Sequence, residues 1–255
     1  MLLEVRDVTK GFGGYQALSG VSFGVQAGAI HALIGPNGAG KTTLFNVASG
    51  VLAPDAGSVL LGGQPITALR PDRIARLGLV RTFQGVRLFG AMTVLENVQT
   101  GRCLRTSSDL LATFLRLPGR DTRQEAATRE RAMALLELVG LAKQRHAIAS
   151  DLALADQRRL EIARALATEP RLLLLDEPVA GMNPVEVNEA AQLIGRIRDG
   201  GVTVLLTEHH MSLVMRISDT ITVLDHGLKI AEGSAEHVRR HPQVLEAYLG
   251  AEAVP

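Results

Sequence analysis

Residues 35–43 are the part of this sequence whose types and spacing point most directly to chemistry. They fit the pattern G-x-x-x-x-G-K-[ST], in which glycines let successive backbone N–H groups approach phosphate oxygens. In such a loop Lys41 reaches the β- and γ-phosphates of a nucleotide, and the Thr42 hydroxyl can ligate Mg²⁺. The residues that we expect to bind the nucleotide are Gly35, Asn37, Gly38, Ala39, Gly40, Lys41, Thr42 and Thr43.

The segments on either side of this loop predict how it is held. Residues 29–34 are largely apolar and typical of a short strand, and residues 43–48 read as the start of a helix. A glycine-rich turn with an incidental lysine is the alternative, but the order of strand, loop and helix disfavours it. We therefore interpret residues 35–43 as a phosphate-binding loop at a helix N-terminus.

A pair of acidic residues is the second candidate for chemistry. Four consecutive leucines at 172–175 are typical of a strand buried on both faces, and Asp176 and Glu177 follow at its carboxyl end. Asp176 would hold Mg²⁺ directly or through water, and Glu177 would orient and deprotonate an attacking water. The alternative is a solvated acidic pair before a proline turn, which the phosphate-binding loop elsewhere in the chain disfavours.

Length and composition limit the classes of protein to consider. The chain has 255 residues, 46% of them hydrophobic, which is enough for one large domain. Cys103 is the single cysteine, so an intrachain disulfide is impossible and a reducing compartment is the simpler expectation. The formal net charge of +1 gives no electrostatic reason to expect nucleic acid or anionic lipid. We find no secretory leader and no apolar stretch near the ~20 residues of a membrane-spanning helix, so we expect no bilayer crossing.

Hydrophobic periodicity and turn signals divide the chain into three regions. The N-terminal region has strand patterns, the middle from about residue 92 to 167 is helical, and an α/β alternation returns after Pro170. The first strand pattern, residues 2–8, alternates as an edge strand would. The other expected elements are strands at 21–25, 57–61, 172–175, 202–206 and 221–224 and a helix at 185–198.

With these features in place, the sequence resembles the nucleotide-binding subunits of ABC transporters over nearly its whole length. Residues 81–84 resemble the Q-loop of that family, in which Gln84 would contact Mg²⁺ and the attacking water and the loop would sense the membrane partner. Residues 207–210 resemble the switch-histidine motif, in which His209 would touch the γ-phosphate. The resemblance thus adds two residues to the site that the loop and the acidic pair define.

Two further motifs of the resemblance leave alternatives open. Phe12 looks like the aromatic residue that stacks on adenine, with Tyr15 as the second candidate and a packed strand-end aromatic as the remaining alternative. Residues 181–184 look like the D-loop, with Asn183 at the usual position of an aspartate; otherwise they form an ordinary turn.

The adjacent histidines also have alternatives. A metal site at His209 and His210 is poorly supported, because neighbouring residues at a strand end point differently and no cluster with zinc spacing accompanies them. We keep a structural role for His210.

One motif departs from the family pattern. The signature loop, usually Leu-Ser-Gly-Gly-Gln, reads Leu-Ala-Leu-Ala-Asp at residues 152–156, and the resemblance places it opposite the γ-phosphate held by a partner subunit. Ala153 lacks the serine hydroxyl, and Ala155 replaces a glycine that permits close backbone approach. We expect Asp156 to cap a helix that begins at Gln157, although its charge is a poor neighbour for phosphate.

The resemblance narrows to the importers of branched-chain amino acids. Residues 81–98 and the ending at 233–250 are similar to subunits of those importers, and the long helical insertion looks like the longer of their two ATP-binding subunits. A related class energises lipopolysaccharide export, and the same fold serves soluble factors in translation and DNA repair.

We therefore predict an α/β P-loop NTPase of the ABC type, with an antiparallel β subdomain and a helical subdomain. Residues 1–84 and 168–255 would form the ATP-binding core of a single domain, and residues 85–167 would form the helical subdomain with the signature loop. The resemblance implies ATP and Mg²⁺ as cofactors. It also implies an ATPase that energises a membrane importer of branched-chain or related amino acids.

The resemblance implies the partners as well. They are a second ATP-binding subunit, in a homodimer or heterodimer, the permease subunits and, indirectly, a solute-binding protein; no nucleic acid is expected. The chain would act at the cytoplasmic face of the inner membrane as a peripheral subunit. The alternatives are a soluble ABC ATPase acting on a nucleic-acid or ribosomal machine, the ATPase of a lipopolysaccharide exporter and, more distantly, a small-molecule kinase.

Overall fold

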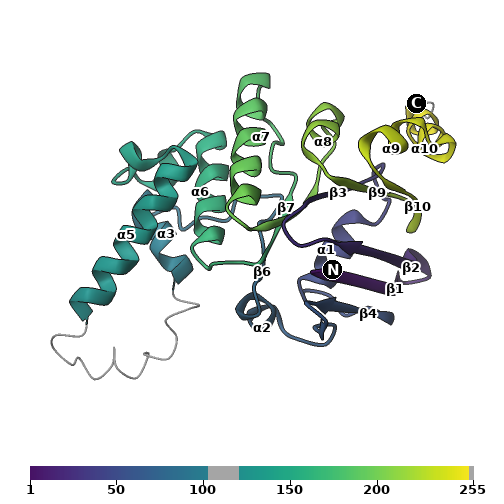
Figure 1. The fold of residues 1–255 in the computed structure, drawn as a ribbon, viewed down its shortest axis with the longest axis horizontal. Coiled ribbons are helices and arrows are strands. Elements are labelled where there is room, and N and C mark those ends of the chain that lie inside the picture. Colours follow the sequence, from purple (N-terminus) through teal and green to yellow (C-terminus); the bar gives the residue numbers. More distant parts are fainter. Residues whose placement is uncertain (103–120, 253–255) are drawn as a thin grey trace.

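The parallel sheet is the centre of the structure. The computed structural model describes residues 1–102 and 121–252, and in this part of the chain one sheet has six strands in the order β10-β9-β3-β8-β7-β6 (Figure 1). β10 is antiparallel to β9, and the other neighbours are parallel. The strands are β3 (Ile30–Ile34), β6 (Leu79–Arg81), β7 (Leu172–Asp176), β8 (Thr203–Thr207), β9 (Thr220–Asp225) and β10 (Leu228–Gly233).

A second, antiparallel sheet covers one side of the first. Within the described residues it has four strands in the order β2-β1-β4-β5, and these are β1 (Leu3–Phe12), β2 (Tyr15–Val25), β4 (Ala56–Leu61) and β5 (Gln64–Pro65). Leu3 pairs with Val25 on one side and with Leu61 on the other, so β1 lies inside this sheet. The prediction of an edge strand at residues 2–8 is therefore wrong. Alternation of apolar and polar residues indicates that one face of a strand is buried. Inner strands of an antiparallel sheet have one buried face as well, so the pattern does not distinguish them from edge strands.

Helices pack between the two sheets and also cover the opposite face of the parallel sheet. α1 (Lys41–Ala48) follows β3, while α7 and α8 lie on the opposite side (Figure 1). α3, α5 and α6 pack on one another at one end of the molecule, inside the region predicted to be helical. The remaining helices are α2 (Pro71–Arg76), α3 (Val94–Arg102), α5 (Asp121–Val139), α6 (Leu154–Leu166), α7 (Pro184–Asp199), α8 (Met211–Ile217), α9 (Ala235–Arg240) and α10 (Pro242–Glu252).

The leucines of β7 show how the parallel sheet is buried on both faces. Leu172 and Leu174 pack with α1 and the antiparallel sheet, whereas Leu173 and Leu175 pack with α6 and α7. Each of the four is fully buried, as the strand pattern predicted. No helix among the described residues is both long and apolar enough to cross a membrane.

His31 is a buried polar residue in β3, directly before the loop at 35–43. Its side chain is 1% exposed, its Nε2 lies 2.8 Å from the Thr222 hydroxyl, and its ring packs on Phe23 with centroids 5.5 Å apart. Burial, with a smaller contribution from the positive charge of Lys229, lowers the pKa of His31 to about 4. The folded protein therefore keeps this imidazole neutral well below its usual pKa.

This pKa predicts a loss of stability in mild acid. Between pH 6.5 and about pH 4 the unfolded chain takes up a proton at His31 and the folded chain does not, so the free energy of unfolding falls as the pH falls, with no further loss below pH 4. The loss attributable to His31 is at most about 3 kcal/mol. Urea denaturation at several pH values would measure it. His31→Gln, which keeps a hydrogen-bonding group, is the control and should show a smaller loss over this range; equal losses would contradict the assignment.

Candidate active site

The carboxyl ends of neighbouring parallel strands bring together segments that lie far apart in the sequence. Because β3, β8, β7 and β6 are adjacent, the residues that follow them share one edge of the sheet. The loop at 35–43 follows β3, Glu177 follows β7, His209 follows β8 and Gln84 follows β6. Ligands commonly bind at this edge of open α/β sheets.

The phosphate-binding loop has a backbone that requires glycine. Gly35 has φ +151° and Gly40 has φ +101°, and Gly40 is the N-cap of α1. A Cβ at Gly35 would collide with the carbonyl oxygen of Leu224, and one at Gly40 would lie 2.5 Å from the carbonyl oxygen of Ala17. Glycine is therefore required at these two positions for two reasons: the backbone has a positive φ, and β9 and β2 leave no room for a Cβ.

Lys41 lies at the start of α1 and is buried. Its ammonium donates to the carbonyl oxygens of Gly35 at 2.7 Å and Pro36 at 3.0 Å, so the side chain folds over its own loop. Burial lowers the pKa of Lys41, and the nearby carboxylates of Glu177 and Asp176 act against that effect. Beside it in the loop, Asn37, Gly38 and Thr42 are exposed, Thr43 is partly exposed and Ala39 is buried.

Glu177 is held by the two other residues that were predicted to be catalytic. The Gln84 amide Nε2 donates to one carboxylate oxygen at 2.9 Å, and the His209 Nε2 lies 3.0 Å from the other. The Glu177 side chain is 17% exposed, and that of His209 is 46% exposed. Two side chains from the ends of two strands thus converge on the partly exposed carboxylate at the end of a third.

The backbone of Glu177 is unusual and is fixed by its neighbours. Its φ of +49° is in the left-handed region, which a non-glycine residue seldom adopts. The Glu177 N–H donates to the carbonyl oxygen of Thr207 at 3.1 Å, and the Arg158 guanidinium donates to the Glu177 carbonyl oxygen at 3.1 Å. Arg158, on α6, was not identified from the sequence. Strained backbone that persists because its surroundings hold it is a common feature of functional sites.

Asp176 is buried and already engaged by two protein groups. Its Oδ1 accepts from the Thr207 hydroxyl at 2.8 Å, and its Oδ2 accepts from the Arg81 guanidinium at 2.6 Å. Arg81 is a second residue that the sequence analysis missed. The available signal was a charged residue at the end of a short apolar strand, at the first position of the segment 81–84 that resembles the Q-loop.

Glu208 is a third residue near the site that was not identified. It is buried, and its carboxylate accepts from the backbone N–H groups of Val179 at 2.9 Å and His209 at 3.1 Å. Burial raises the pKa of Glu208. The carboxylate therefore positions the main chain that carries the His209 ring. His210 lies beside it with Nδ1 3.0 Å from the Ser212 hydroxyl.

The two aromatic candidates for adenine contact form the ends of one hairpin. Phe12 and Tyr15 are paired across β1 and β2, and both are exposed. The Tyr15 hydroxyl donates to the carbonyl oxygen of Gly38 at 3.2 Å, and the Lys10 ammonium lies 5.7 Å from the centre of the Phe12 ring. Tyr15 thus contacts the phosphate-binding loop, and Phe12 is its partner across the hairpin.

The altered signature loop differs from the expectation in one respect. α6 begins at Leu154 with Ala153 as N-cap, and no side chain caps this end, so the prediction that Asp156 caps a helix starting at Gln157 is wrong. The helix starts earlier because the Gln157 N–H already donates to the Ala153 carbonyl oxygen at 2.9 Å. Asp156 lies in the first turn and accepts from Gln144 at 3.2 Å.

The remaining residues of this loop and of the D-loop have local partners. Arg159 lies 3.4 Å from Asp156 and also pairs with Glu189 of α7. The Gln157 amide donates to the carbonyl oxygen of Leu152 at 2.9 Å, and Ala155 is buried. Asn183 forms a capping box at the start of α7: its side chain accepts from two backbone N–H groups, and its own N–H donates to Glu186 at 2.8 Å.

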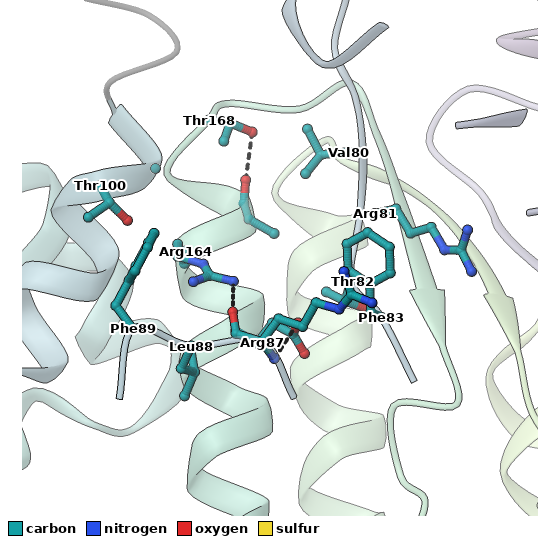
Figure 2. Close-up of a pocket in the computed structure, with 13 residues that line it drawn as sticks. Val80, Arg81, Thr82, Phe83, Arg87, Leu88, Phe89, Thr100, Arg164 and Thr168 are labelled. Atoms are coloured by element: carbon teal, nitrogen blue, oxygen red, sulfur yellow. Dashed lines mark hydrogen bonds between the residues drawn. The ribbon is translucent and has the colours of Figure 1, made fainter. Parts of the chain in front are cut away.

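A cavity of about 660 Å³ lies next to Gln84, between β6, α3 and α6 (Figure 2). Glu161 of α6 lines it and accepts from the Arg87 N–H at 3.4 Å, while the Arg164 guanidinium donates to the Arg87 carbonyl oxygen. The Arg164 guanidinium also lies 5.5 Å from the centre of the Phe89 ring. Residues 83–89 are therefore attached to the helix that begins at the signature loop.

The residues at this edge fit a nucleotide and Mg²⁺. Left-handed glycines, the Lys41 ammonium and the start of α1 suit phosphate groups. The described residues contain no cluster of three or more His, Cys, Asp or Glu that could hold a metal by themselves. Mg²⁺ is usually bound through one or two carboxylates together with substrate phosphates.

Comparisons with known proteins agree with this geometry. The ABC transporter family profile matches residues 18–180, and a profile described as branched-chain amino acid ATP-binding cassette transporter matches residues 229–254. The chain is 45% identical over 250 residues to the high-affinity branched-chain amino acid transport ATP-binding protein LivG of Escherichia coli, covering 98% of each chain. Its identity to BraF of Pseudomonas aeruginosa, which carries the same description, is also 45%, with 98% coverage of each chain.

Solved structures place the fold in the same family. A nucleotide-free ATP-binding cassette from an ABC transporter matches with a TM-score of 0.83 and 32% identity, over 97% of this chain and 98% of that one. A dimeric bacterial ABC transporter cassette matches with a TM-score of 0.75 and 25% identity, over 91% and 98%.

The chain belongs to the ABC transporter family. It is an ATP-binding cassette with the α/β P-loop fold, and the predicted fold class is confirmed. Its relatives at 45% identity are ATP-binding proteins of branched-chain amino acid transport.

Lys41→Ala should weaken ATP binding itself, because the phosphates lose their nearest buried cation. A charge-assisted contact of this kind corresponds to a loss of about 10- to 100-fold in affinity. Direct titration with ATP measures it, and Lys143→Ala, at an exposed position, is the control for removal of a positive charge. An unchanged dissociation constant in Lys41→Ala would contradict the assignment of the loop.

Proposed function

We propose that this chain is the ATP-hydrolysing subunit of an importer for branched-chain amino acids. The observation that carries the proposal is the Glu177 carboxylate, held by Gln84 at 2.9 Å and His209 at 3.0 Å beside a phosphate-binding loop. The names of the relatives at 45% identity support the choice of solute and of import.

In this proposal Glu177 is the general base. Its carboxylate accepts a proton from the attacking water, and the hydrogen bonds from Gln84 and the position of His209 fix its orientation. His209 would also reach the γ-phosphate, which its exposed ring can approach. Lys41 offsets the phosphate charge, and the fixed backbone of Glu177 limits the reorganisation needed when the water reacts.

Mg²⁺ would be held by the Thr42 hydroxyl, Asp176 and Gln84. The ion would neutralise charge on the phosphates during transfer. Adenine would stack on Phe12, with Tyr15 as the other candidate.

A second ATP-binding subunit would complete each site. Ala153, Ala155, Asp156 and Gln157 of one subunit would face the γ-phosphate bound by its partner, and Asn183 would lie at the same interface. The dimeric form of a related cassette supports this arrangement. The partner would be a second copy or a different ATP-binding subunit.

The permease would dock at the cavity beside the Q-loop residues. The helical subdomain, residues 85–167, forms one side of that cavity through α3 and α6, and the ATP-binding core, residues 1–84 and 168–255, forms the other. Arg164 of α6 donates to the Arg87 carbonyl oxygen, and the Arg87 guanidinium lies 4.4 Å from the centre of the Phe83 ring on the other side, so docking would be felt at the neighbouring Gln84 (Figure 2). The chain would thus lie at the cytoplasmic face of the inner membrane, with a solute-binding protein acting on the far side and no nucleic acid involved.

Glu177→Gln should leave ATP affinity nearly unchanged and stop turnover, because the change keeps the shape of the side chain but removes the base. An ATP-stabilised dimer should accumulate. In proteoliposomes with the permease subunits that copurify with this chain, the variant should abolish ATP-dependent leucine uptake.

Glu236→Gln, on the exposed α9, is the matched control and should preserve hydrolysis and uptake. Hydrolysis at the unmodified rate in Glu177→Gln would contradict the role of the base. Normal ATPase activity without uptake of any branched-chain amino acid would contradict the proposed solute but not the proposed mechanism of ATP hydrolysis.

The signature loop predicts weak ATPase activity for this chain alone. Two of its differences from the family sequence remove a hydroxyl at residue 153, which is exposed, and add a methyl group at residue 155, which is buried. Loss of one preorganised donor costs roughly 10² to 10³ in rate. In a heterodimer one site would remain competent, namely the one that combines Lys41 and Glu177 with an intact signature loop of the other subunit.

The triple variant Ala153→Ser, Ala155→Gly, Asp156→Gln should therefore raise the ATPase rate of this chain severalfold. The serine would also cap α6, which starts without a side-chain cap, so the free energies of unfolding of the two proteins must be compared along with their rates. Rates must be compared at equal dimer fraction. A triple variant that is no faster would show that the altered loop is harmless.

A further inference from the structure

Arg81 connects three parts of the candidate active site. It is the last residue of β6, and one guanidinium nitrogen donates to the Asp176 carboxylate at 2.6 Å. The other terminal nitrogen donates to the Asn46 side-chain oxygen of α1 at 2.6 Å. One side chain thus joins the strand before Gln84, the helix of the phosphate-binding loop and the acid predicted to hold Mg²⁺.

The environment of Arg81 holds it in place. Its side chain and that of Asp176 are each 5% exposed. The guanidinium carbon lies 5.5 Å from the centre of the Phe45 ring and 5.2 Å from the centre of the Phe83 ring, so the cation is close to two aromatic rings. A desolvated pair of this kind is screened little by salt, and its charges act strongly on the adjacent site.

The charges around the loop balance because of Arg81. Lys41 and Arg81 are positive, and Asp176 and Glu177 are negative, so these four side chains sum to zero. Neutralising Arg81 would leave a net charge of −1. The site would then attract a divalent cation more strongly and a metal-free nucleotide anion less strongly.

We propose that Arg81 is a positioning residue that sets the metal affinity of this site: it orients Asp176 through a buried ion pair and offsets its charge. The inference rests on the proposed function, because it takes Mg²⁺ and nucleotide as the ligands of the site. It predicts opposite changes in two binding constants, whereas general damage to the site would weaken both.

Arg81→Gln is the test variant. The first measurement is the affinity of the protein for AMP-PNP in excess EDTA, by calorimetry. The second is the affinity of the AMP-PNP complex for Mn²⁺, from the electron paramagnetic resonance signal of free Mn²⁺. We expect nucleotide affinity in EDTA to fall and Mn²⁺ affinity to rise, each by about three- to tenfold.

Two matched variants separate charge from packing. Arg81→Lys keeps the positive charge and should keep both constants near those of the unmodified protein. Arg87→Gln removes another guanidinium that packs on Phe83, 4.4 Å from the centre of its ring. Arg87 has no ion pair among the described side chains, so this variant should leave both binding constants unchanged.

Arg81→Gln leaves the buried Asp176 carboxylate without its ion-pair partner, and this variant can fail to fold. Asn46→Asp is a second variant that tests the inference with the ion pair retained. The new carboxylate is nearly isosteric with the amide and would share the Arg81 charge, so the same opposite shifts are expected. If the nucleotide affinity and the Mn²⁺ affinity change in the same direction, or if neither changes, the inference is overturned. Nucleotide binding by the unmodified protein would still support the proposed function in that case. Failure of the unmodified protein to bind AMP-PNP in the presence or absence of Mn²⁺ would overturn both.

Discussion

The parallel pairing of β3, β8, β7 and β6 is the constraint on which the rest of the structure depends. In this register Asp176 pairs with Thr207, which places the residues after β7 and β8 side by side. A slip of one residue would exchange the two faces of β7, because side chains alternate along a strand, and it would separate Asp176 from the Thr207 hydroxyl that donates to it. The observed register positions Glu177 beside His209.

The site combines side chains that we propose to act on the nucleotide with groups that hold those side chains in place. Gln84 and His209 contact the Glu177 carboxylate, while Arg158 and the Thr207 carbonyl fix its main chain. Glu208 does the same for the backbone of His209. The left-handed backbone at Glu177 is tolerated because several independent contacts define it.

The helix that starts at the signature loop links this site to the rest of the molecule. Along α6, Arg158 contacts Glu177, Glu161 contacts the backbone at Arg87, and Arg164 contacts Arg87 again. Burial raises the pKa of Glu161. One helix thus contacts the acidic residue, the Q-loop segment and the wall of the cavity (Figure 2).

The sequence pointed to the residues that we propose to face a substrate, but not to the residues that support them. Patterns such as G-x-x-x-x-G-K-[ST] record groups needed at fixed spacing in one loop, and Lys41 could be read from that spacing. Arg81, Arg158 and Glu208 have no such pattern, because their roles depend on segments that only folding brings near. The start of α6 was misplaced because the polar Asp156 resembled a cap, although the helix already begins at Leu154.

By itself the sequence determined the local chemistry and the order of elements: a phosphate-binding loop between a strand and a helix, an acidic pair after four leucines, and a family resemblance carried by short motifs. Tertiary structure decided which of those motifs meet, that β1 lies inside its sheet, and that Arg81 neutralises Asp176. The physical reason is the distance along the chain between the residues that interact. Loop geometry and strand burial follow from neighbours along the chain, whereas hydrogen bonds and ion pairs between distant segments depend on the sheet order and on packing between sheets and helices.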